Sequence, residues 1–443
     1  MDTPILDFVQ RYAASGTARL HMPGHKGASF LGCEALDLTE IAGADALYEA
    51  DGIIAGSEEN AAALFGTART LFSTEGSSQC IKAMLYLALT CRSKGAAPVI
   101  VAARNVHKAF VHAAALLDFE IVWLWPEESR SLCTCPITAQ ALEKTLSALP
   151  SPPAAVYVTS PDYLGNMQDI AALSEVAHRY GTILAVDNAH GAYLRFLPQS
   201  LHPMDLGADL CCDSAHKTLP VLTGGAYLHI SPTAPAAFRE SAKTAMALFG
   251  STSPSYLTLA SLDGCNRYLA EEYPPRLAAT VERLDALRAA IQEKGWQVEK
   301  SDPLRITLTA PADLTGHALA QRLRSGGVEC EYADPESLVL MATPENREED
   351  FRRLALALGE NHAPTAAVRL PLARGERDLS CREALFTSHE TIPTALSLGR
   401  ICAAPTVGCP PAIPVVVSGE RIGEEALQVF AHYGIPFVDV VKE

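Results

Sequence analysis

The sequence of 443 residues lacks any apolar run near the roughly 20 residues that a membrane-spanning helix needs. Its first residues, MDTPILDFVQRYAASG, have no basic stretch followed by an apolar core, so we expect no signal peptide. Basic residues are also scarce: 35 Lys and Arg stand against 51 Asp and Glu, which gives a net charge of −16 at pH 7. Because nonspecific binding to nucleic acid or to an anionic membrane requires a basic surface, the composition argues against both partners.

The chain also lacks the cysteine spacing of a disulfide framework, although it contains 12 cysteines. Neighbouring cysteines such as Cys211 and Cys212 stand too close for an ordinary structural zinc site. The Pro-Gly turn in HMPGH likewise keeps His21 and His25 from the helical spacing of a zinc pair. We therefore expect free thiols, no bound metal and a reducing, cytoplasmic location.

Between residues 36 and 255, apolar segments of strand length alternate with segments of helix length. A chain this long exceeds one ordinary hydrophobic core, so we expect two or more domains, with 36–255 as a large one. Residues 1–35 look irregular and are interpreted as an N-terminal arm. Helices are predicted over 77–94 and 169–181, with Gly95 and Gly181 as their stops, and strands over 98–103, 119–125, 154–160 and 182–187. This alternation predicts an α/β fold with a mostly parallel sheet, whose chemistry lies at the carboxyl ends of the strands.

The pattern changes near residue 255. The stretch PPRLAATVERLDALRAAIQEKG predicts a long helix, because its apolar residues form one stripe between Pro275 and Gly295. Strand, helix, strand and helix are then predicted over 304–310, 315–327, 337–342 and 347–359, and 361–371 resembles a linker. We therefore expect a linking helix and a small α+β domain over 256–365. A C-terminal segment over 366–443 would follow, with a Pro-rich turn and a strand in PPAIPVVVSGE.

Two ionisable residues that could take part in catalysis stand at the ends of apolar runs. Asp187 ends the strand 182–187, and Lys217 follows the run LGADLCC in DSAHKTLP. A buried lysine has a lowered pKa and attacks carbonyl carbons, whereas a buried carboxylate needs a cation beside it. An acid and a lysine at strand ends fit pyridoxal phosphate, in which the lysine forms the Schiff base and the aspartate holds a proton on the pyridine nitrogen. A plain Asp–Lys ion pair, or two exposed loop residues, explains the same spacing.

The phosphate group of the cofactor needs a binding site, and the stretch TEGSSQC is a candidate for it. Gly76, Ser77 and Ser78 stand at the start of the helix 77–94, where backbone N–H groups and the helix dipole attract an anion. Taken alone, these residues are better explained as an ordinary serine N-cap. His107 in ARNVHKAF follows the strand 98–103 and suits stacking on a pyridine ring, with a purely structural histidine as the alternative.

Together these motifs resemble the ornithine/lysine/arginine decarboxylases, which are fold type I (aspartate-aminotransferase-like) pyridoxal phosphate enzymes. The resembling stretches include RLHMPGHKG, RNVHKAF, TSPDYLGNMQDI, VDNAHGAY, DSAHKTLPVLTGG and LGRICAAPTVGCPPAIPVVVSGE, and they run in family order from about residue 19 to residue 423. The resemblance implies a large domain with a mostly parallel seven-stranded sheet and a smaller α+β C-terminal domain. It also implies a cytoplasmic homodimer with shared active sites and a role in polyamine biosynthesis.

The resemblance further implies roles for the matching residues. Lys217 would carry the cofactor as an aldimine, Asp187 would pair with the ring nitrogen, and His107 would stack on the ring. The other implied cofactor-binding residues are Gly76, Ser77, Ser78, Ser214 and His216, with Ser251 or Thr252 reaching the phosphate of the neighbouring subunit.

The sequence also departs from the family pattern. Glu75 stands where the family usually has Asn, and a carboxylate there would repel a phosphate unless it points away. Asn188 replaces the Glu that usually follows the aspartate, so a carboxylate beside the site is lost, and LTGG departs from the usual Thr-Gln. Because the first family motif begins about 20 residues into the chain, we expect neither the family's N-terminal wing domain nor a decamer.

We expect this site to decarboxylate a basic amino acid, either lysine, arginine or ornithine, to the corresponding amine. Lys217 or His216 is predicted to protonate the α-carbon after CO₂ leaves. A carboxylate must bind the cationic side chain, and the candidates are Asp45 in GADAL and Glu390 in SHETIPTALSLGR, although each fits a solvated surface acid as well. The alternatives are another pyridoxal phosphate reaction on this fold, such as transamination or lyase chemistry, and a noncatalytic cofactor-binding protein.

Overall fold

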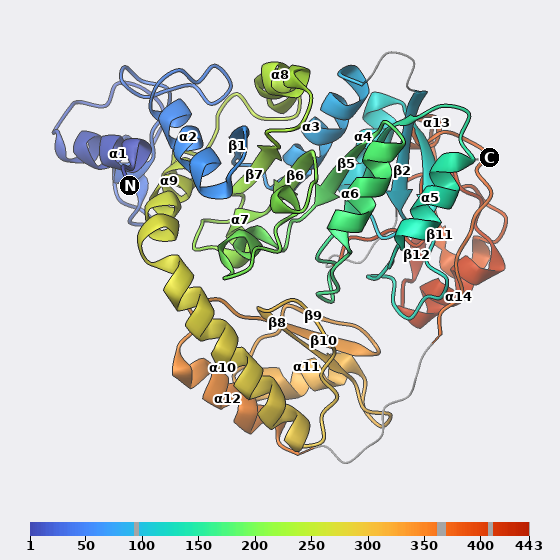
Figure 1. Ribbon diagram of the computed structural model, residues 1–443. Helices are drawn as coiled ribbons and strands as arrows, with labels where there is room; N and C mark the ends of the chain where they lie inside the picture. The colour runs from blue at the N-terminus through green and yellow to red at the C-terminus, as the bar shows by residue number, and fades with distance from the viewer. Residues whose placement is uncertain (93–96, 361–368, 406–410, 443) are drawn as a thin grey trace. The chain divides into compact units, whose positions relative to one another are not determined.

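The computed structural model describes residues 1–92, 97–360, 369–405 and 411–442 (Figure 1). These residues form two compact units, each built from separate stretches of the chain. The first unit comprises Met1–Ala97, Leu146–Val158 and Asp169–Leu277, and the second comprises Pro98–Thr145, Thr159–Gln168 and Ala278–Glu443. The sequence-based division into four segments, with boundaries near 36, 256 and 366, stays a prediction, and its last boundary and the 361–371 linker fall mostly outside the described residues.

A seven-stranded sheet carries the α/β part of the fold, with the strand order β1-β7-β6-β5-β4-β2-β3. The strands are β1 (Arg69–Ser73), β2 (Ala97–Ala103), β3 (Glu120–Leu124), β4 (Pro153–Thr159), β5 (Ile183–Asp187), β6 (Leu210–Asp213) and β7 (Ala226–Ile230). The pairs β2–β3 and β5–β6 are parallel, whereas β7 is antiparallel to both β1 and β6. The predicted α/β class with a mostly parallel sheet is confirmed, and the four predicted strands correspond to β2, β3, β4 and β5.

Helices connect most of these strands, as the alternating pattern predicts, and two more helices, α2 (Ile53–Phe65) and α8 (Ala236–Ala247), precede the first strand and follow the last. The connecting helices are α3 (Ser77–Thr90), α4 (Lys108–Leu117), α5 (Ala139–Ser147), α6 (Ile170–Arg179) and α7 (Ala215–Thr218). The helix predicted over 169–181 is α6, which the Asp169 side chain caps by accepting the N–H of Ala172 and after which Gly181 takes a left-handed conformation. The helix predicted over 77–94 is α3; it ends at Thr90, and its expected stop, Gly95, lies outside the described residues.

The N-terminal residues are not irregular throughout, so the prediction for 1–35 was wrong in part. Residues Pro4–Ala14 form helix α1, which contacts α9 (Tyr256–Glu271), and η1 (Glu34–Leu36) follows. Ile5 and Val9, one helical turn apart, are fully buried. The N–H of Leu6 donates to the Asp263 carboxylate of α9 over 2.9 Å, so a short apolar stripe became helical through tertiary contacts.

The second unit contains a separate antiparallel sheet, whose order is β8-β10-β9. Its strands are β8 (Arg305–Thr309), β9 (Tyr332–Ala333) and β10 (Ser337–Met341), and the neighbouring helices are α10 (Tyr273–Glu293), α11 (Gly316–Ser325) and α12 (Glu348–Leu358) (Figure 1). These elements confirm the predicted helix 274–295 and the predicted strand, helix, strand and helix that follow it.

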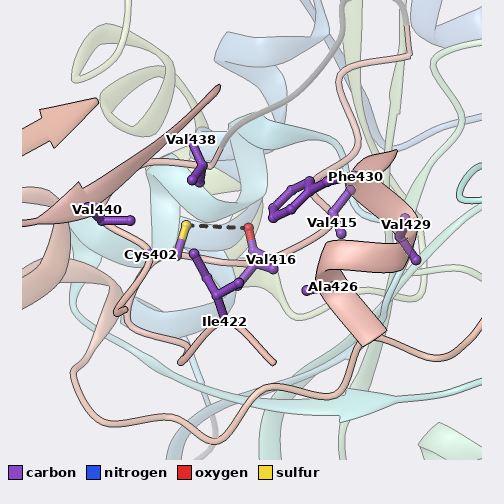
Figure 2. Packing of buried hydrophobic residues seen from close by; sticks show 9 residues of the cluster. All are labelled: Cys402, Val415, Val416, Ile422, Ala426, Val429, Phe430, Val438 and Val440. Carbon is purple, nitrogen blue, oxygen red and sulfur yellow. Dashed lines mark hydrogen bonds between the residues drawn. The ribbon is translucent and has the colours of Figure 1, made fainter. Parts of the chain in front are cut away.

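The last part of the chain forms α13 (Cys381–Leu385), β11 (His389–Pro393), η4 (Thr394–Leu396), α14 (Glu424–His432) and β12 (Phe437–Val441). The strand predicted within PPAIPVVVSGE is absent from the described residues 411–420, so that prediction was wrong. Val415 and Val416 instead enter a buried cluster with Cys402, Phe430 and Val438, and the Cys402 thiol donates to the Val416 carbonyl over 3.7 Å (Figure 2). Apolar residues therefore mark burial here without marking a strand.

The cysteines described by the structure, namely all but Cys409, are free thiols, as the sequence predicts. Among the described helices, none combines the length and the apolar character required to cross a bilayer.

Candidate active site

Lys217 lies on the short helix α7, directly after strand β6, at the strand end where the sequence places it. Its side chain is half-buried, and its Nζ atom lies 3.0 Å from the Nε2 atom of His190. His190 follows strand β5, and only 5% of it is exposed. Two strand ends therefore bring a lysine amine and a buried imidazole into hydrogen-bonding contact.

Asp187 is the last residue of β5, and only 2% of it is exposed. Its carboxylate accepts the hydroxyl of Tyr157 over 3.1 Å, the N–H of Ala189 over 3.2 Å and the thiol of Cys212 over 3.7 Å. Burial raises the pKa of Asp187, while the nearby charge of Lys217 opposes that rise. A desolvated carboxylate of this kind strongly favours a cationic N–H partner.

The start of α3 has the features of an anion cradle. Gly76 precedes the helix with φ 72° and ψ 179°, a conformation that favours glycine. The Ser214 hydroxyl donates to the Ser77 hydroxyl over 2.9 Å, and Ser78 lies in the same first turn. The N–H groups at the start of a helix are the ones that attract an anion. The N–H of Gly76 donates to the carbonyl of Gly224 over 2.7 Å, so this turn is tied to the LTGG stretch.

Glu75 is exposed, and its carboxylate accepts the backbone N–H of Ser251. This contact ties the charge of Glu75 to the loop that contains Ser251 and Thr252, both of which are exposed. The carboxylate is therefore held toward this loop, and its effect on a bound phosphate stays a prediction.

His216 precedes Lys217 on α7, and its Nδ1 atom lies 3.0 Å from the carbonyl oxygen of Gly225. The backbone N–H of His216 donates to the same oxygen over 3.1 Å. Because a carbonyl oxygen only accepts, Nδ1 carries the proton, and the imidazole is held in one orientation beside Lys217.

His107 belongs to the second unit, where it is the N-cap residue of α4. Its Nδ1 atom accepts the N–H of Ala109 over 3.1 Å, which fixes the ring at the end of the loop after β2. The predicted contact between His107 and a cofactor on Lys217 involves both units and stays a prediction.

The two predicted substrate carboxylates have other hydrogen bonds. Asp45 is buried and accepts backbone N–H groups from residues 46, 51, 52, 54 and 55, so it organises the loop before α2. Glu390 lies on β11 in the second unit and accepts a guanidinium N–H of Arg400 over 2.6 Å. Neither acid is a solvated surface group without contacts, and a role in substrate binding stays a prediction for both.

Sequence reasoning missed His190, Tyr157 and Asp213, although all three lie near predicted residues. His190 is part of the stretch VDNAHGAY and follows Asp187 by three residues, which was an available signal. Tyr157 lies on β4 and Asp213 ends β6, so their contacts depend on strand register, which the sequence does not reveal.

Comparison with known proteins identifies the family. A family model described as "Orn/Lys/Arg decarboxylase, major domain" matches residues 3–350. The chain belongs to this family. An arginine decarboxylase of Bacillus subtilis is 30% identical over 463 residues, which cover 96% of this chain and 92% of that protein.

Solved structures support the same fold. The lysine decarboxylase of Francisella novicida matches with a TM-score of 0.81 at 17% identity, over 99% of this chain and 81% of that one. The serine palmitoyltransferase of Sphingomonas wittichii matches with a TM-score of 0.56 at 16% identity, over 81% of this chain and 83% of that one. These matches confirm the predicted fold type I architecture.

The decarboxylase is therefore a pyridoxal-phosphate-dependent carboxy-lyase, as the motifs indicate. The first unit has features that fit this cofactor. The amine of Lys217 suits its aldehyde, the desolvated carboxylate of Asp187 suits the ring nitrogen, and the start of α3 with Ser77 and Ser214 suits the phosphate. Family membership favours decarboxylation over transamination, over other lyase chemistry and over noncatalytic cofactor binding.

Proposed function

We propose that this decarboxylase acts on a basic amino acid, either lysine, arginine or ornithine, and releases CO₂ and the corresponding amine. The family description names these three amino acids, and the matched relatives include an arginine decarboxylase and a lysine decarboxylase. The observation that carries the proposal is the cluster of Lys217, His190 and Asp187 at neighbouring strand ends of the first unit.

Asp187 is proposed to hold a proton on the ring nitrogen of the cofactor. Its burial disfavours an unpaired negative charge, and the Tyr157 hydroxyl and the Ala189 N–H fix the orientation of its oxygen atoms. Pyridoxal phosphate, when bound, supplies an electron-poor ring that stabilises the charge left at the α-carbon when CO₂ departs.

Lys217 must lose a proton before its amine can act as a nucleophile. The Nε2 atom of His190 lies at hydrogen-bonding distance from Nζ and is placed to accept that proton. After CO₂ leaves, Lys217 or His216 would return a proton to the α-carbon. His216 is held in one orientation by Gly225, which suits a group that must point at a single atom.

The proposed phosphate site consists of the first turn of α3 with Gly76, Ser77 and Ser78, together with Ser214. Ser251 or Thr252 of one subunit would reach the phosphate held by its partner. In that arrangement the decarboxylase is a homodimer with shared active sites, and His107 stacks on the cofactor ring.

Exposed apolar side chains support the homodimer. Leu20, Met22, Phe30 and Leu31 lie within 12 residues of one another, and each is at least 67% exposed. An exposed run of large apolar side chains marks an interaction site in a water-soluble protein. We propose that these residues pack against a second copy of the chain, in a cytoplasmic enzyme that takes part in polyamine biosynthesis.

The cationic end of the substrate requires a carboxylate, for which Glu390 and Asp45 are the candidates from the sequence. Glu390 already pairs with Arg400, and Asp45 accepts five backbone N–H groups, so a substrate cation must share or replace these contacts. Glu390→Gln and Asp45→Asn test them, and an increase in KM with little change in kcat would identify the residue that binds the distant cation.

The experiment that tests the proposed reaction supplies purified, cofactor-loaded protein with lysine, arginine and ornithine in separate reactions. CO₂ and the amine product are measured, with Lys217→Ala as the control. We expect one of the three to yield CO₂ and amine in equal amounts, and the variant to yield neither. Absence of CO₂ from all three, with the visible absorption of the bound cofactor intact, would contradict the proposed substrate class.

A further inference from the structure

The carboxylate of Asp213 is the most extensively hydrogen-bonded buried charge next to the proposed site. Asp213 ends β6, immediately before Ser214, and its exposed fraction is 0%. One of its oxygen atoms lies 3.0 Å from Nε2 of His202 and 3.1 Å from Nε2 of His229. The other accepts the amide N–H of Asn188 over 2.7 Å.

The two histidines contact Asp213 through their Nε2 atoms. The Nδ1 atom of His202 accepts the backbone N–H of Met204 over 3.3 Å, so the ring proton is on Nε2 and points at Asp213. Burial lowers the pKa of His229, although the contact with Asp213 opposes that shift. Burial alone would raise the pKa of Asp213, but the charge interactions and hydrogen bonds of His202 and His229 hold it well below its ordinary value. The carboxylate of Asp213 is therefore stabilised in its charged form by these contacts.

Strand geometry separates this charge from the cofactor side of the sheet. The thiol of Cys212 contacts Asp187, whereas the thiol of Cys211 contacts Asp213 over 3.6 Å. Because successive side chains of a strand point to opposite faces, Asp213 and Asp187 lie on opposite faces of the sheet. Asp213 therefore influences the site through other residues.

Asn188 provides the connection. The carbonyl oxygen of Asn188 accepts the N–H of Gly191 over 2.7 Å, which closes the turn 188–191. A Cβ atom at Gly191 would lie 2.0 Å from the side-chain oxygen of Asn188, so the turn packs directly against that side chain. His190 lies within this turn and contacts the amine of Lys217.

We propose that Asp213 is a positioning residue of the decarboxylase site. Its buried carboxylate holds Asn188, and the turn 188–191 then holds the ring of His190 against the amine of Lys217. In the hydrogen-bonded pair of Asp213 and Asn188, the carboxylate is the last residue of β6 and the amide directly follows β5. The inference rests on the proposed role of Lys217.

The test compares two buried aspartates at opposite ends of β6. Asp209 directly precedes the strand, is 4% exposed, and accepts from His178 over 2.8 Å and from the N–H of Leu184 over 2.9 Å. Asp209→Asn is therefore the matched control for Asp213→Asn. The readouts are kcat and KM for CO₂ release, the thermal unfolding midpoint, and the pH midpoint of the visible absorption of the bound cofactor.

Asp213→Asn should lower kcat by about 10- to 100-fold and shift the pH midpoint of the cofactor absorption, because a small misplacement of a reacting group is enough for such losses. Asp209→Asn should lower the unfolding midpoint but change kcat by no more than about twofold, since no catalytic group depends on it. Equal effects of the two variants on kcat and on the absorption would overturn the proposal.

An exchange of the two side chains tests the pairing and covers the case in which Asp213→Asn does not fold. Asn188→Asp alone places two carboxylates in contact and should lose activity. The double variant Asn188→Asp with Asp213→Asn restores one acid and one amide, and its kcat should recover to within about 10-fold of the wild type. A double variant that unfolds like the wild type but stays as slow as the slower single variant would overturn the proposal.

Two further results are informative. The absorption titration needs no substrate, so it tests the positioning role even if none of the three amino acids yields CO₂.

His202, Cys211 and Asp213 also lie close enough to bind a metal ion. One equivalent of zinc in the purified wild type would overturn the hydrogen-bonded arrangement, whereas protein without stoichiometric metal supports it.

Discussion

The Nε2 atom of His190 lies 3.0 Å from the Nζ atom of Lys217, although the two residues are 27 positions apart in the sequence. This contact joins the ends of β5 and β6 and leaves both side chains largely shielded from water. A proton can pass between an amine and an imidazole at this distance, which makes His190 the nearest candidate proton acceptor for the proposed nucleophile.

His190→Gln tests this role. The variant retains a hydrogen-bonding side chain of similar reach but cannot take a proton, so we expect kcat for CO₂ release to fall by about 100-fold or more. His178→Gln, which changes a histidine paired with Asp209, is the control and should retain nearly full activity. A kcat for His190→Gln within about twofold of the wild type would exclude His190 as a proton acceptor.

Ser214→Ala tests the phosphate site. Loss of the hydroxyl that contacts Ser77 should raise the Kd for pyridoxal phosphate by about 10-fold, because hydrogen bonds to charged groups contribute about 1.5–3 kcal/mol. Binding of pyridoxal, which lacks the phosphate, should stay unchanged. Equal weakening for both ligands would show that Ser214 supports the fold of the site and does not bind the phosphate.

His229 predicts a pH dependence of stability. Its ring faces Asp213 on β6, His202 at the N-cap of η3 (Pro203–Asp205), Thr70 on β1 and Phe65 on α2, and burial lowers its pKa. Below about pH 6.5 the unfolded chain binds a proton at this residue that the folded chain does not, so the free energy of unfolding decreases as the pH falls.

The measurement compares the unfolding midpoints of wild type and His229→Gln at about pH 7.5 and about pH 5. The variant is expected to be less stable at the higher pH but to lose less stability on acidification, because it has no imidazole to protonate. Parallel losses in the two proteins would show that His229 does not titrate differently in the folded and unfolded states.

Arg104 and Glu420 form a buried ion pair in the second unit, over 3.2 Å. Arg104 also donates to the carbonyls of Pro414 and Val415, which joins the residue after β2 to the C-terminal part of the chain. Glu420→Gln should lower the free energy of unfolding by about 3–5 kcal/mol, because it leaves a guanidinium buried without its counter-ion. Denaturant unfolding measures this loss.

Replacing both partners, as Arg104→Met with Glu420→Leu, should cost less than Glu420→Gln alone, because no charge is then left unpaired. A double variant that is less stable than the single one would show that the stabilisation comes from the hydrogen bonds of Arg104 to the backbone and not from the pairing of charges.

Much of the fold was predictable, because periodicity reports local burial. The helices α3, α6, α10, α11 and α12 and the strands β2 to β5 follow from apolar spacing and from glycine or proline at their ends. Helix α1 was missed because its stripe of apolar residues is short and because its stability comes from packing against α9. The strand expected at Val415 was wrong because an apolar run reports burial and does not reveal a strand partner.

The site was predictable where a residue type itself implies chemistry. Lys217 and Asp187 stand out because charged residues at the ends of buried strands need a reason to be there. His190, Tyr157 and Asp213 did not stand out, since their contacts depend on which strands are neighbours and on register. The loss of a carboxylate at Asn188 looked like a deficit in the sequence, yet that side chain pairs with the carboxylate of Asp213.

The most direct test of the account asks which lysine binds the cofactor. The purified decarboxylase is incubated with pyridoxal phosphate, reduced with borohydride to make the covalent link permanent, digested and analysed by mass spectrometry. We predict that the reduced cofactor is found on the peptide that contains Lys217. Stoichiometric attachment to a different lysine, with Lys217 unmodified, would contradict the assignment of the active site to the carboxyl ends of β5 and β6.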